Sequence, residues 1–188
     1  MHLEPLPLTF SARDTTEVAR ALLGQVVVLE RGQRRRTGRI VETEAYLGPH
    51  DLACHTAKGR TKRTEPMFGP PGHAYVYLVY GMHFCLNVVT GHGAAVLLRA
   101  LEPLDAENTD DASKPTMNGP AKLTKVLGVT LSHNTLPLDV APLWLARGEA
   151  VPPRFITARP RIGVDYAGAW AKRKLRFYDS RSRHISKP

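Results

Sequence analysis

The stretch from Val41 to His55 reads VETEAYLGPHDLACH and combines carboxylate, aromatic and imidazole side chains. Side chains alternate between the two faces of an extended strand, so Glu42, Glu44 and Tyr46 share one face. A carboxylate beside an aromatic ring can activate water next to a planar group that stacks on that ring. The pattern therefore indicates hydrolysis of a bond adjacent to a ring in the substrate.

Glu42 and Glu44 leave two mechanisms open. Two positions apart on one strand, their side chains would lie roughly 7 Å apart, which is near the separation that inverting glycosidases use. Alternatively, Glu44 acts alone and Glu42 forms an ion pair with a surface arginine. We favour the second interpretation.

His55 fits a proton carrier, a pocket wall, a metal ligand or a core side chain. A metal site would recruit His50 and Asp51, but the chain has no His-Glu-x-x-His or comparable spacing that would supply a ligand pair. The two cysteines, Cys54 and Cys85, form no Cys-x-x-Cys pair. We therefore expect an enzyme without metal or cofactor.

Tyrosines and two polar residues mark the strands that follow. Tyr75, Tyr77 and Tyr80 could stack on bases, although tyrosine is also common in strands for packing reasons. Tyr80 precedes Gly81 at an expected turn, where its ring would project and could wedge between bases. Asn87 and Arg99 lie in otherwise apolar strands, so each must be hydrogen-bonded within the fold or face a ligand. Glu44 would be a suitable partner for Arg99.

Periodicity predicts the elements that position these residues. We expect a helix over residues 11–23 capped by Asp14, a β-hairpin over residues 25–46 and a three-stranded meander over residues 73–101. A second helix should be capped by Asn118, with Pro120 in its first turn and Gly128 at its end. The remaining expected elements are short strands at residues 143–145 and 155–158, followed by a turn, a helical piece and a last strand within residues 162–178.

Three segments are expected to be irregular. Residues 48–71 hold many turn-forming residues and four basic side chains, which is typical of a functional loop. The acidic stretch over residues 102–118 should be solvated and inert. Residues 180–188 should form a flexible basic tail that could touch phosphate.

Length and charge bound the function classes. At 188 residues we expect a single domain over residues 1–188. Lysine and arginine number 26 against 17 acidic residues, and the net charge of +9 favours a nucleic-acid partner over an enzyme that is merely basic. No segment reaches roughly 18 consecutive apolar residues and the N-terminus lacks a signal-peptide pattern, so we expect a cytoplasmic protein.

Several long motifs occur in order along the chain, and together they carry a family resemblance. They are GRIVETEAYLG with His55 nine residues after Tyr46, MFGPPGHAYVYLVYGMHFCLN, VLLRALEP, NGPAKL near Asn118, and RIGVDYAGAWAKRKLRFY. The chain resembles the alkyladenine (3-methyladenine) DNA glycosylase family, the fold type of the mammalian enzyme. The resemblance covers most of the chain and suggests a compact bacterial form, which would associate with the nucleoid.

The resemblance implies an α+β (mixed α/β) single domain with a curved antiparallel β-sheet, flanking helices and a protruding β-hairpin that inserts into DNA. Tyr80 would be the intercalating wedge, with Met82 beside it, and would fill the gap that a flipped nucleotide leaves. The flipped base would stack between Tyr77 on one side and Tyr46 with His55 on the other. Aromatic walls of this kind favour cationic, alkylated bases.

The resemblance also implies roles for the polar residues. Glu44 matches the general base of the family, which would hold water against the anomeric carbon together with Arg99 and a main-chain carbonyl near Ile162. Asn87 matches a pocket residue that crowds the exocyclic amine of ordinary guanine. Two departures, His83 for a tyrosine and Cys54 for an alanine, leave the lesion preference open.

The resulting prediction is a monofunctional, metal-free DNA N-glycosylase that flips and hydrolytically excises damaged purines and so initiates base excision repair. Its substrates would be 3-methyladenine, 7-methylguanine, ethenoadenine and, among deaminated purines, hypoxanthine. Its partner would be double-stranded DNA containing damaged bases, it would act as a monomer, and it would have no lyase activity.

Two rival functions stay open at this point. A non-catalytic protein that binds damaged or single-stranded DNA would use the same basic surface, but the Glu44 carboxylate would weaken simple phosphate binding. A hydrolase of free nucleosides would show no steep dependence of duplex affinity on salt.

Overall fold

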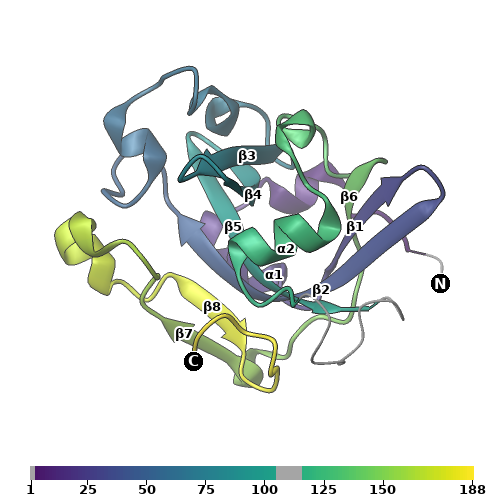
Figure 1. Cartoon of the computed structure of the whole chain (residues 1–188). Coiled ribbons are helices and arrows are strands. Elements are labelled where there is room, and N and C mark those ends of the chain that lie inside the picture. The colour runs from purple at the N-terminus through teal and green to yellow at the C-terminus, as the bar shows by residue number, and fades with distance from the viewer. Residues whose placement is uncertain (1–2, 105–115) are drawn as a thin grey trace.

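The computed structural model of the chain describes residues 3–104 and 116–188 (Figure 1). Eight antiparallel strands form one curved sheet in which β3-β4-β5-β2-β1-β6 lie side by side, while β7 and β8 branch off through a pairing of β8 with β2. The same described residues also form two α-helices and several short 3-10 helices. This α+β architecture with a curved antiparallel sheet confirms the predicted fold class. The predicted acidic excursion falls largely on residues 105–115, which lie outside the described residues.

The strands and helices follow the expected order. The strands are β1 (Val26–Arg31), β2 (Arg34–Tyr46), β3 (Ala74–Val79), β4 (His83–Gly91), β5 (Ala94–Pro103), β6 (Leu143–Ala146), β7 (Ile156–Arg159) and β8 (Arg176–Asp179), and the α-helices are α1 (Thr15–Ala21) and α2 (Pro120–Leu127). The hairpin, the meander and both helices were therefore predicted, with boundaries shifted by a few residues.

The start of each α-helix shows how local sequence sets the boundary. Asp14 caps α1 as predicted, because its side chain accepts hydrogen bonds from the backbone N–H groups of Thr16 and Glu17. The cap predicted for α2 is wrong by one residue, since Gly119 occupies the N-cap position. The Asn118 side chain accepts a hydrogen bond from Lys122 instead.

The long strand β2 changes partners along its length. Its first half pairs with β1, its second half pairs with β8, and β5 runs along its other side. The register with β5 shifts twice near Glu42, which leaves Val41 and Arg99 without a directly opposite residue. Bulges of this kind bend a strand and redirect its side chains. The candidate acid Glu44 therefore lies close to the point where the sheet branches.

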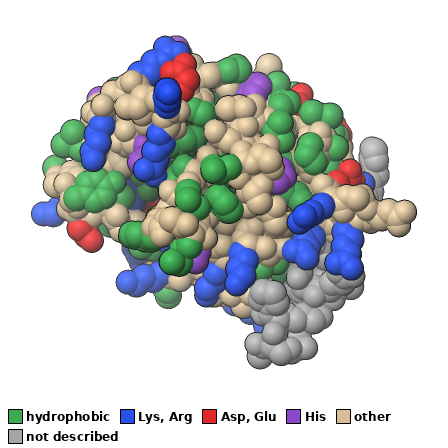
Figure 2. All heavy atoms as spheres, turned by 45° about the horizontal axis from the view of Figure 1, so that its top comes forward, with side chains coloured by type: hydrophobic (Ala, Val, Ile, Leu, Met, Phe, Trp, Pro, Cys, Tyr) green, Lys and Arg blue, Asp and Glu red, His purple; other side chains and the backbone are tan. Residues whose placement is uncertain are grey.

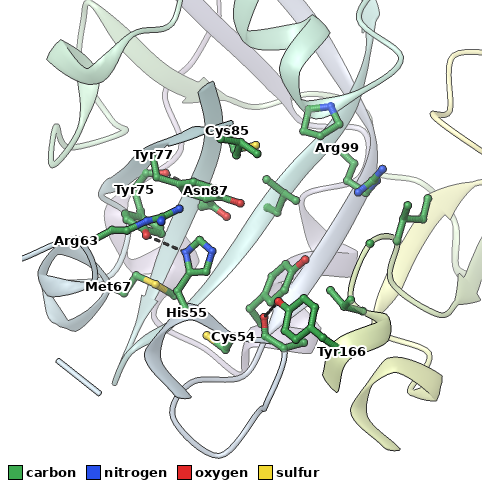
Figure 3. Close-up of a pocket in the computed structure, with 18 of the residues that line it drawn as sticks. Cys54, His55, Arg63, Met67, Tyr75, Tyr77, Cys85, Asn87, Arg99 and Tyr166 are labelled. Atoms are coloured by element: carbon green, nitrogen blue, oxygen red, sulfur yellow. Dashed lines mark hydrogen bonds between the residues drawn. The ribbon is translucent and has the colours of Figure 1, made fainter. Parts of the chain in front are cut away.

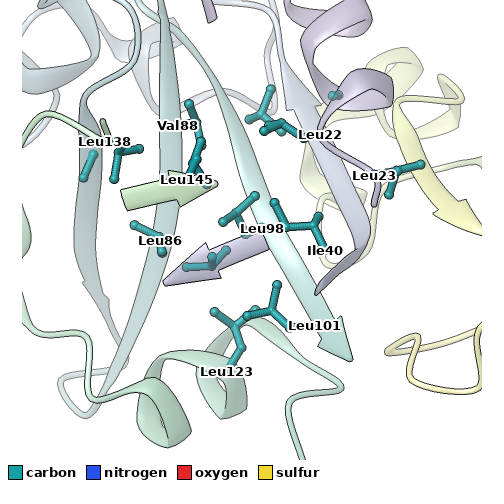
Figure 4. Packing of buried hydrophobic residues seen from close by; sticks show 14 of the residues in the cluster. Leu22, Leu23, Ile40, Leu86, Val88, Leu98, Leu101, Leu123, Leu138 and Leu145 are labelled. Carbon is teal, nitrogen blue, oxygen red and sulfur yellow. The ribbon is translucent and has the colours of Figure 1, made fainter. Parts of the chain in front are cut away.

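The two faces of the sheet have different tasks. Leu86, Val88 and Leu98 point to one face, where they pack with apolar residues of α1 and α2 in the main core (Figure 4). Residues of the opposite parity, such as Asn87 and Leu97, point to the other face and line a pocket. The alternation of side chains along each strand thus gives the sheet one apolar face, which packs in the core, and one face with polar side chains, which lines the pocket.

The turn between β3 and β4 is exposed and has an unusual backbone. Tyr80 adopts φ 51° and Gly81 adopts φ 71°, and few non-glycine residues take such left-handed values. The Tyr80 side chain is 89% exposed and Met82 is 70% exposed. The hairpin therefore presents two large apolar side chains to solvent at its tip.

The C-terminal segment differs from the expected loose tail. Residues 180–188 follow β8 and turn back over β7 and β8 in the view of Figure 1. The backbone N–H of Ser186 donates a hydrogen bond of 2.6 Å to Glu42, and the Lys187 carbonyl accepts one of 2.6 Å from Arg176. These contacts bind the segment to the centre of the domain.

None of the helices within the described residues is long and apolar enough to cross a membrane.

Replacing Leu98 with alanine should destabilise the protein by about 2–5 kcal/mol, because its fully buried side chain fills the core between the sheet and the helices. Urea unfolding followed by circular dichroism measures the loss. Leu131→Ala is the matched control, since Leu131 is 51% exposed and should change stability by less than about 0.5 kcal/mol. Equal effects of the two substitutions would contradict the assignment of the core.

Candidate active site

A pocket of about 430 Å³ opens on the face of the sheet opposite the main core (Figure 3). Strands β3, β4 and β5 contribute Tyr75, Tyr77, Cys85, Asn87, Leu97 and Arg99 to its wall. The loop after β2 adds Cys54, His55, Arg63 and Met67, and the segment before β8 adds Ile162, Gly163, Val164 and Tyr166. Its volume lies within the usual range of small-molecule sites.

Glu44 lies directly behind this pocket and is fully buried. Its Oε1 accepts a hydrogen bond of 2.8 Å from the Ile162 backbone N–H and forms an ion pair with Arg99 Nη1 at 3.3 Å. Its Oε2 accepts a hydrogen bond of 2.8 Å from the Tyr46 hydroxyl. The group of Ile162 that meets Glu44 is thus its N–H, whereas the resemblance implied a carbonyl near this residue.

The surroundings of Glu44 push its proton affinity in opposite directions. Burial raises the pKa of Glu44 above its ordinary value, and the neighbouring Glu42 charge adds to this. Arg99, the Ile162 N–H and the Tyr46 hydroxyl lower the same pKa, because each stabilises the ionised form. The net rise gives a carboxylate that accepts a proton more readily than one in water, as a general base must.

Glu42 does not pair with a surface arginine, so that prediction is wrong. Its side chain is fully buried and accepts hydrogen bonds from Arg176 Nη1 at 2.8 Å and from the Ser186 N–H and hydroxyl. Arg99 Nε lies 3.5 Å from the same carboxylate. The reason is the pairing of β2 with β8, which covers this part of the strand.

Tyr46 is held from two sides. Its hydroxyl donates to Glu44, and the Arg161 guanidinium lies 4.7 Å from its ring centroid. Arg161 is itself fixed by a fully buried pair with Asp51, with contacts of 2.5 and 2.8 Å. Burial and the adjacent Glu44 charge raise the pKa of Tyr46, so its hydroxyl remains a hydrogen-bond donor.

His55 and Tyr77 meet edge to face, with ring centroids 4.6 Å apart (Figure 3). His55 Nδ1 also lies 3.0 Å from the Tyr75 hydroxyl. Two aromatic rings in contact have centroids about 4.5–7 Å apart. A base that lies between His55 and Tyr77 must make such a contact with each of them, so the two rings would have to move apart.

The other predicted residues occupy different depths of the site. Asn87 is buried in the wall and donates a hydrogen bond of 2.9 Å to the Tyr75 carbonyl. Tyr80 lines the outer part of the pocket, whereas Met82 is exposed beside it on the hairpin. Of the two departures from the family pattern, Cys54 lies in the wall and His83 is exposed at the start of β4.

Sequence reasoning missed several residues that the structure brings to this site. Cys85 shares a strand face with Tyr75, Tyr77 and Asn87, so strand alternation could have identified it. Arg63, from the long basic loop, lies 5.3 Å from the Tyr77 ring centroid. No pattern in the sequence indicates the Asp51–Arg161 pair, since it joins residues 110 positions apart.

Comparisons with known proteins identify the family. A family model described as Methylpurine-DNA glycosylase (MPG) matches residues 9–183. The chain belongs to this family. As a member it is a DNA glycosylase, an enzyme that hydrolyses N-glycosyl bonds in the repair of alkylated bases, which confirms the predicted enzyme class and the predicted family.

Individual relatives are similar over nearly their whole length. A protein of Myxococcus xanthus (strain DK1622) named "Putative 3-methyladenine DNA glycosylase" is 54% identical over 185 residues, which cover 97% of this chain and 93% of that protein. Proteins of the same name from Legionella pneumophila (strain Corby) and Methanocella arvoryzae are each 47% identical, over 188 and 193 residues. These alignments cover 98% and 97% of this chain and 100% and 96% of the two relatives.

His55 should stay neutral at pH 7. Burial, with the nearby positive charges of Arg63 and Lys58, lowers the pKa of His55 from 6.5 to about 4. Because the folded-state pKa lies below the unfolded one, His55 favours folding above pH 6.5, and this contribution is lost as the pH falls from 6.5 to 4. Nitrogen-detected NMR titration, with His55→Gln to assign the signal, should give a midpoint near 4. A midpoint near 6.5 would contradict the buried placement.

Proposed function

We propose that this glycosylase flips alkylated purines, 3-methyladenine foremost, out of duplex DNA and hydrolyses their N-glycosyl bonds with Glu44 as general base. One observation carries this proposal. A fully buried carboxylate with a raised pKa lies behind an aromatic pocket and contacts three groups, Tyr46, Arg99 and Ile162, that line the pocket wall. The names of the bacterial and archaeal relatives support the same substrate class.

The proposed reaction needs one carboxylate. Glu44 takes a proton from water as the water oxygen attacks the anomeric carbon of deoxyribose, and the N-glycosyl bond electrons leave with the base. The negative charge of Glu44 also stabilises the positive charge that develops on the sugar. A purine methylated on its ring, such as 3-methyladenine or 7-methylguanine, is cationic, so the departing electrons neutralise it and no acid is required.

The pocket wall supports a choice among bases. Tyr77 on one side, and Tyr46 with His55 on the other, would stack on a flipped purine, and such rings attract a cationic base. Asn87, held by its bond to the Tyr75 carbonyl, would crowd the exocyclic amine of guanine. We extend the proposal to 7-methylguanine, ethenoadenine and hypoxanthine. For hypoxanthine and ethenoadenine, which are both neutral bases, a proton donor beyond the residues named here is required.

The outer surface suits duplex DNA. The exposed Tyr80 would fill the gap in the duplex, with Met82 beside it. Figure 2 shows one face of the molecule, where Lys and Arg side chains surround a group of hydrophobic side chains and acidic ones are few. Basic side chains placed in this way can neutralise phosphates while the hairpin enters the minor groove.

Two further features belong to the proposal. The described residues that line the pocket include no lysine, and a lysine amine is the nucleophile that lyase chemistry needs. We therefore propose monofunctional hydrolysis that leaves an abasic site. We also propose that the enzyme acts as a monomer. A protein that only binds DNA would gain nothing from a buried, ionisable Glu44.

Glu44→Gln should lower excision by about 10²- to 10⁴-fold, because the amide cannot accept the proton of water. The substrate is a duplex with one ethenoadenine or hypoxanthine in a single-turnover reaction. Hot alkali then breaks the strand at each abasic site, so the amount of broken strand measures excision. The variant should still bind the duplex, with an affinity that falls steeply as salt rises.

Glu30→Gln is the matched control for this experiment, since Glu30 pairs with Arg35 at the surface, away from the pocket. Excision by Glu44→Gln at the wild-type rate would remove Glu44 from the role of base. Duplex affinity that does not depend on salt would instead favour a hydrolase of free nucleosides.

Tyr80→Ala should reduce excision from duplex DNA by on the order of tenfold or more, because the gap left by a flipped base costs a few kcal/mol when nothing fills it. Excision from single-stranded DNA should change much less. The free energy of unfolding should stay within about 0.5 kcal/mol of wild type, as the side chain is 89% exposed. Val140→Ala, another exposed apolar position, serves as control. Equal losses on both substrates would argue against the wedge.

A further inference from the structure

The C-terminal segment is connected to the proposed catalytic acid, Glu44, through Glu42 and Arg99. Ser186 donates to both oxygens of Glu42, from its N–H to Oε2 at 2.6 Å and from its hydroxyl to Oε1 at 3.0 Å. The same hydroxyl accepts a hydrogen bond of 3.2 Å from Arg99 Nε. One side-chain oxygen thus joins a fully buried carboxylate to the arginine that faces Glu44.

Arg99 lies between two buried carboxylates. Its Nε is directed at Ser186 and Glu42, and its Nη1 is directed at Glu44 Oε1 at 3.3 Å. A guanidinium is rigid and planar, so fixing Nε also fixes the direction of Nη1. The β5 bulge places Arg99 outside the regular register, where strand pairing alone does not orient its side chain.

Arg176 secures the other side of the same cluster. Its Nη1 donates to Glu42 at 2.8 Å and to the Lys187 carbonyl at 2.6 Å, and its Nε donates to the Pro160 carbonyl at 3.0 Å. Two buried carboxylates are therefore balanced by two guanidinium groups. Buried charges are tolerated only when paired and hydrogen-bonded, and the C-terminal segment adds two donors from Ser186 and the Lys187 carbonyl as acceptor to this cluster.

We propose that Ser186 is a positioning residue of the glycosylase reaction, which with Glu42 orients Arg99 so that its guanidinium faces Glu44. The inference rests on the proposed role of Glu44 as base. It concerns a part of the chain outside the family match, which ends at residue 183. Ser186 itself touches no substrate, and it acts through Arg99.

The pH dependence of the reaction distinguishes positioning from a merely structural role. Arg99 lowers the pKa of Glu44, so a loosened guanidinium should let that pKa rise. Glu44 would then be protonated at a higher pH, and the loss of rate would be larger at low pH than at high pH. The other charged or titratable groups that face Glu44 are Glu42 and Tyr46 of β2, Tyr77 of β3, Cys85 of β4 and Arg161, and among them Glu42 is the one that Ser186 contacts.

The experiment compares Ser186→Ala with Ser186→Thr, which keeps a hydroxyl, and with Ser180→Ala, an exposed position of the same segment. Single-turnover excision of ethenoadenine from a duplex is measured across the pH range, and melting temperatures are recorded in parallel. We expect Ser186→Ala to lose about tenfold in rate near neutral pH and to shift the acid limb upward by about half a unit. Ser186→Thr should recover most of the rate, and Ser180→Ala should match wild type.

A second readout does not depend on activity. Carbon-detected NMR of ¹³C-labelled glutamate, with Glu44→Gln to assign the signal, follows the protonation of Glu44 directly. Its midpoint should rise in Ser186→Ala and stay unchanged in Ser180→Ala. An unchanged midpoint, or a loss of rate that is uniform over pH and follows a lower melting temperature, would overturn the positioning role.

Glu44→Gln in the same series separates the two proposals. Wild-type excision by Glu44→Gln would defeat the proposed function. An inactive Glu44→Gln together with a wild-type profile for Ser186→Ala would defeat only the inference about Ser186.

Discussion

The site depends on keeping the fully buried carboxylate of Glu44 ionisable. Burial makes the charged form of Glu44 costly, and only a few contacts oppose that cost. Arg99, the Ile162 N–H and the Tyr46 hydroxyl come from three different parts of the chain, so the sheet must bring them together. The pairing of β2 with β8 serves this purpose, because the segment that connects β7 to β8 brings Ile162 to the acid.

Part of this arrangement could be predicted because it is local. Alternation in β2, β3 and β4 identifies which side chains share a face, and so brings Glu44, Tyr77 and Asn87 to one surface. Asp14 and the glycine turns mark boundaries through contacts within a few residues. Periodicity predicted the strand face on which these residues lie, and their expected roles came from the resemblance to the family.

The rest could not be predicted because it depends on distant contacts. Glu42 was predicted to lie at the surface, because no residue near it in the sequence indicates that β8 and the C-terminal segment cover it. Its hydrogen bond with Ser186 joins residues 144 positions apart. The same holds for Arg161, whose partner Asp51 lies in a loop without regular structure. Buried charges of this type are paired by the tertiary fold, so single-sequence reasoning recognises the polar residue but not its partner.

The left-handed backbone at Tyr80 and Gly81 has a consequence for how the enzyme meets DNA. A turn already set in its final shape loses little conformational entropy when it enters a duplex, unlike a flexible loop that must first become ordered. On the proposed function, a tip that keeps this shape in the free protein would enter the duplex at a small ordering cost. The protein would then test many base pairs and withdraw quickly from those that are sound.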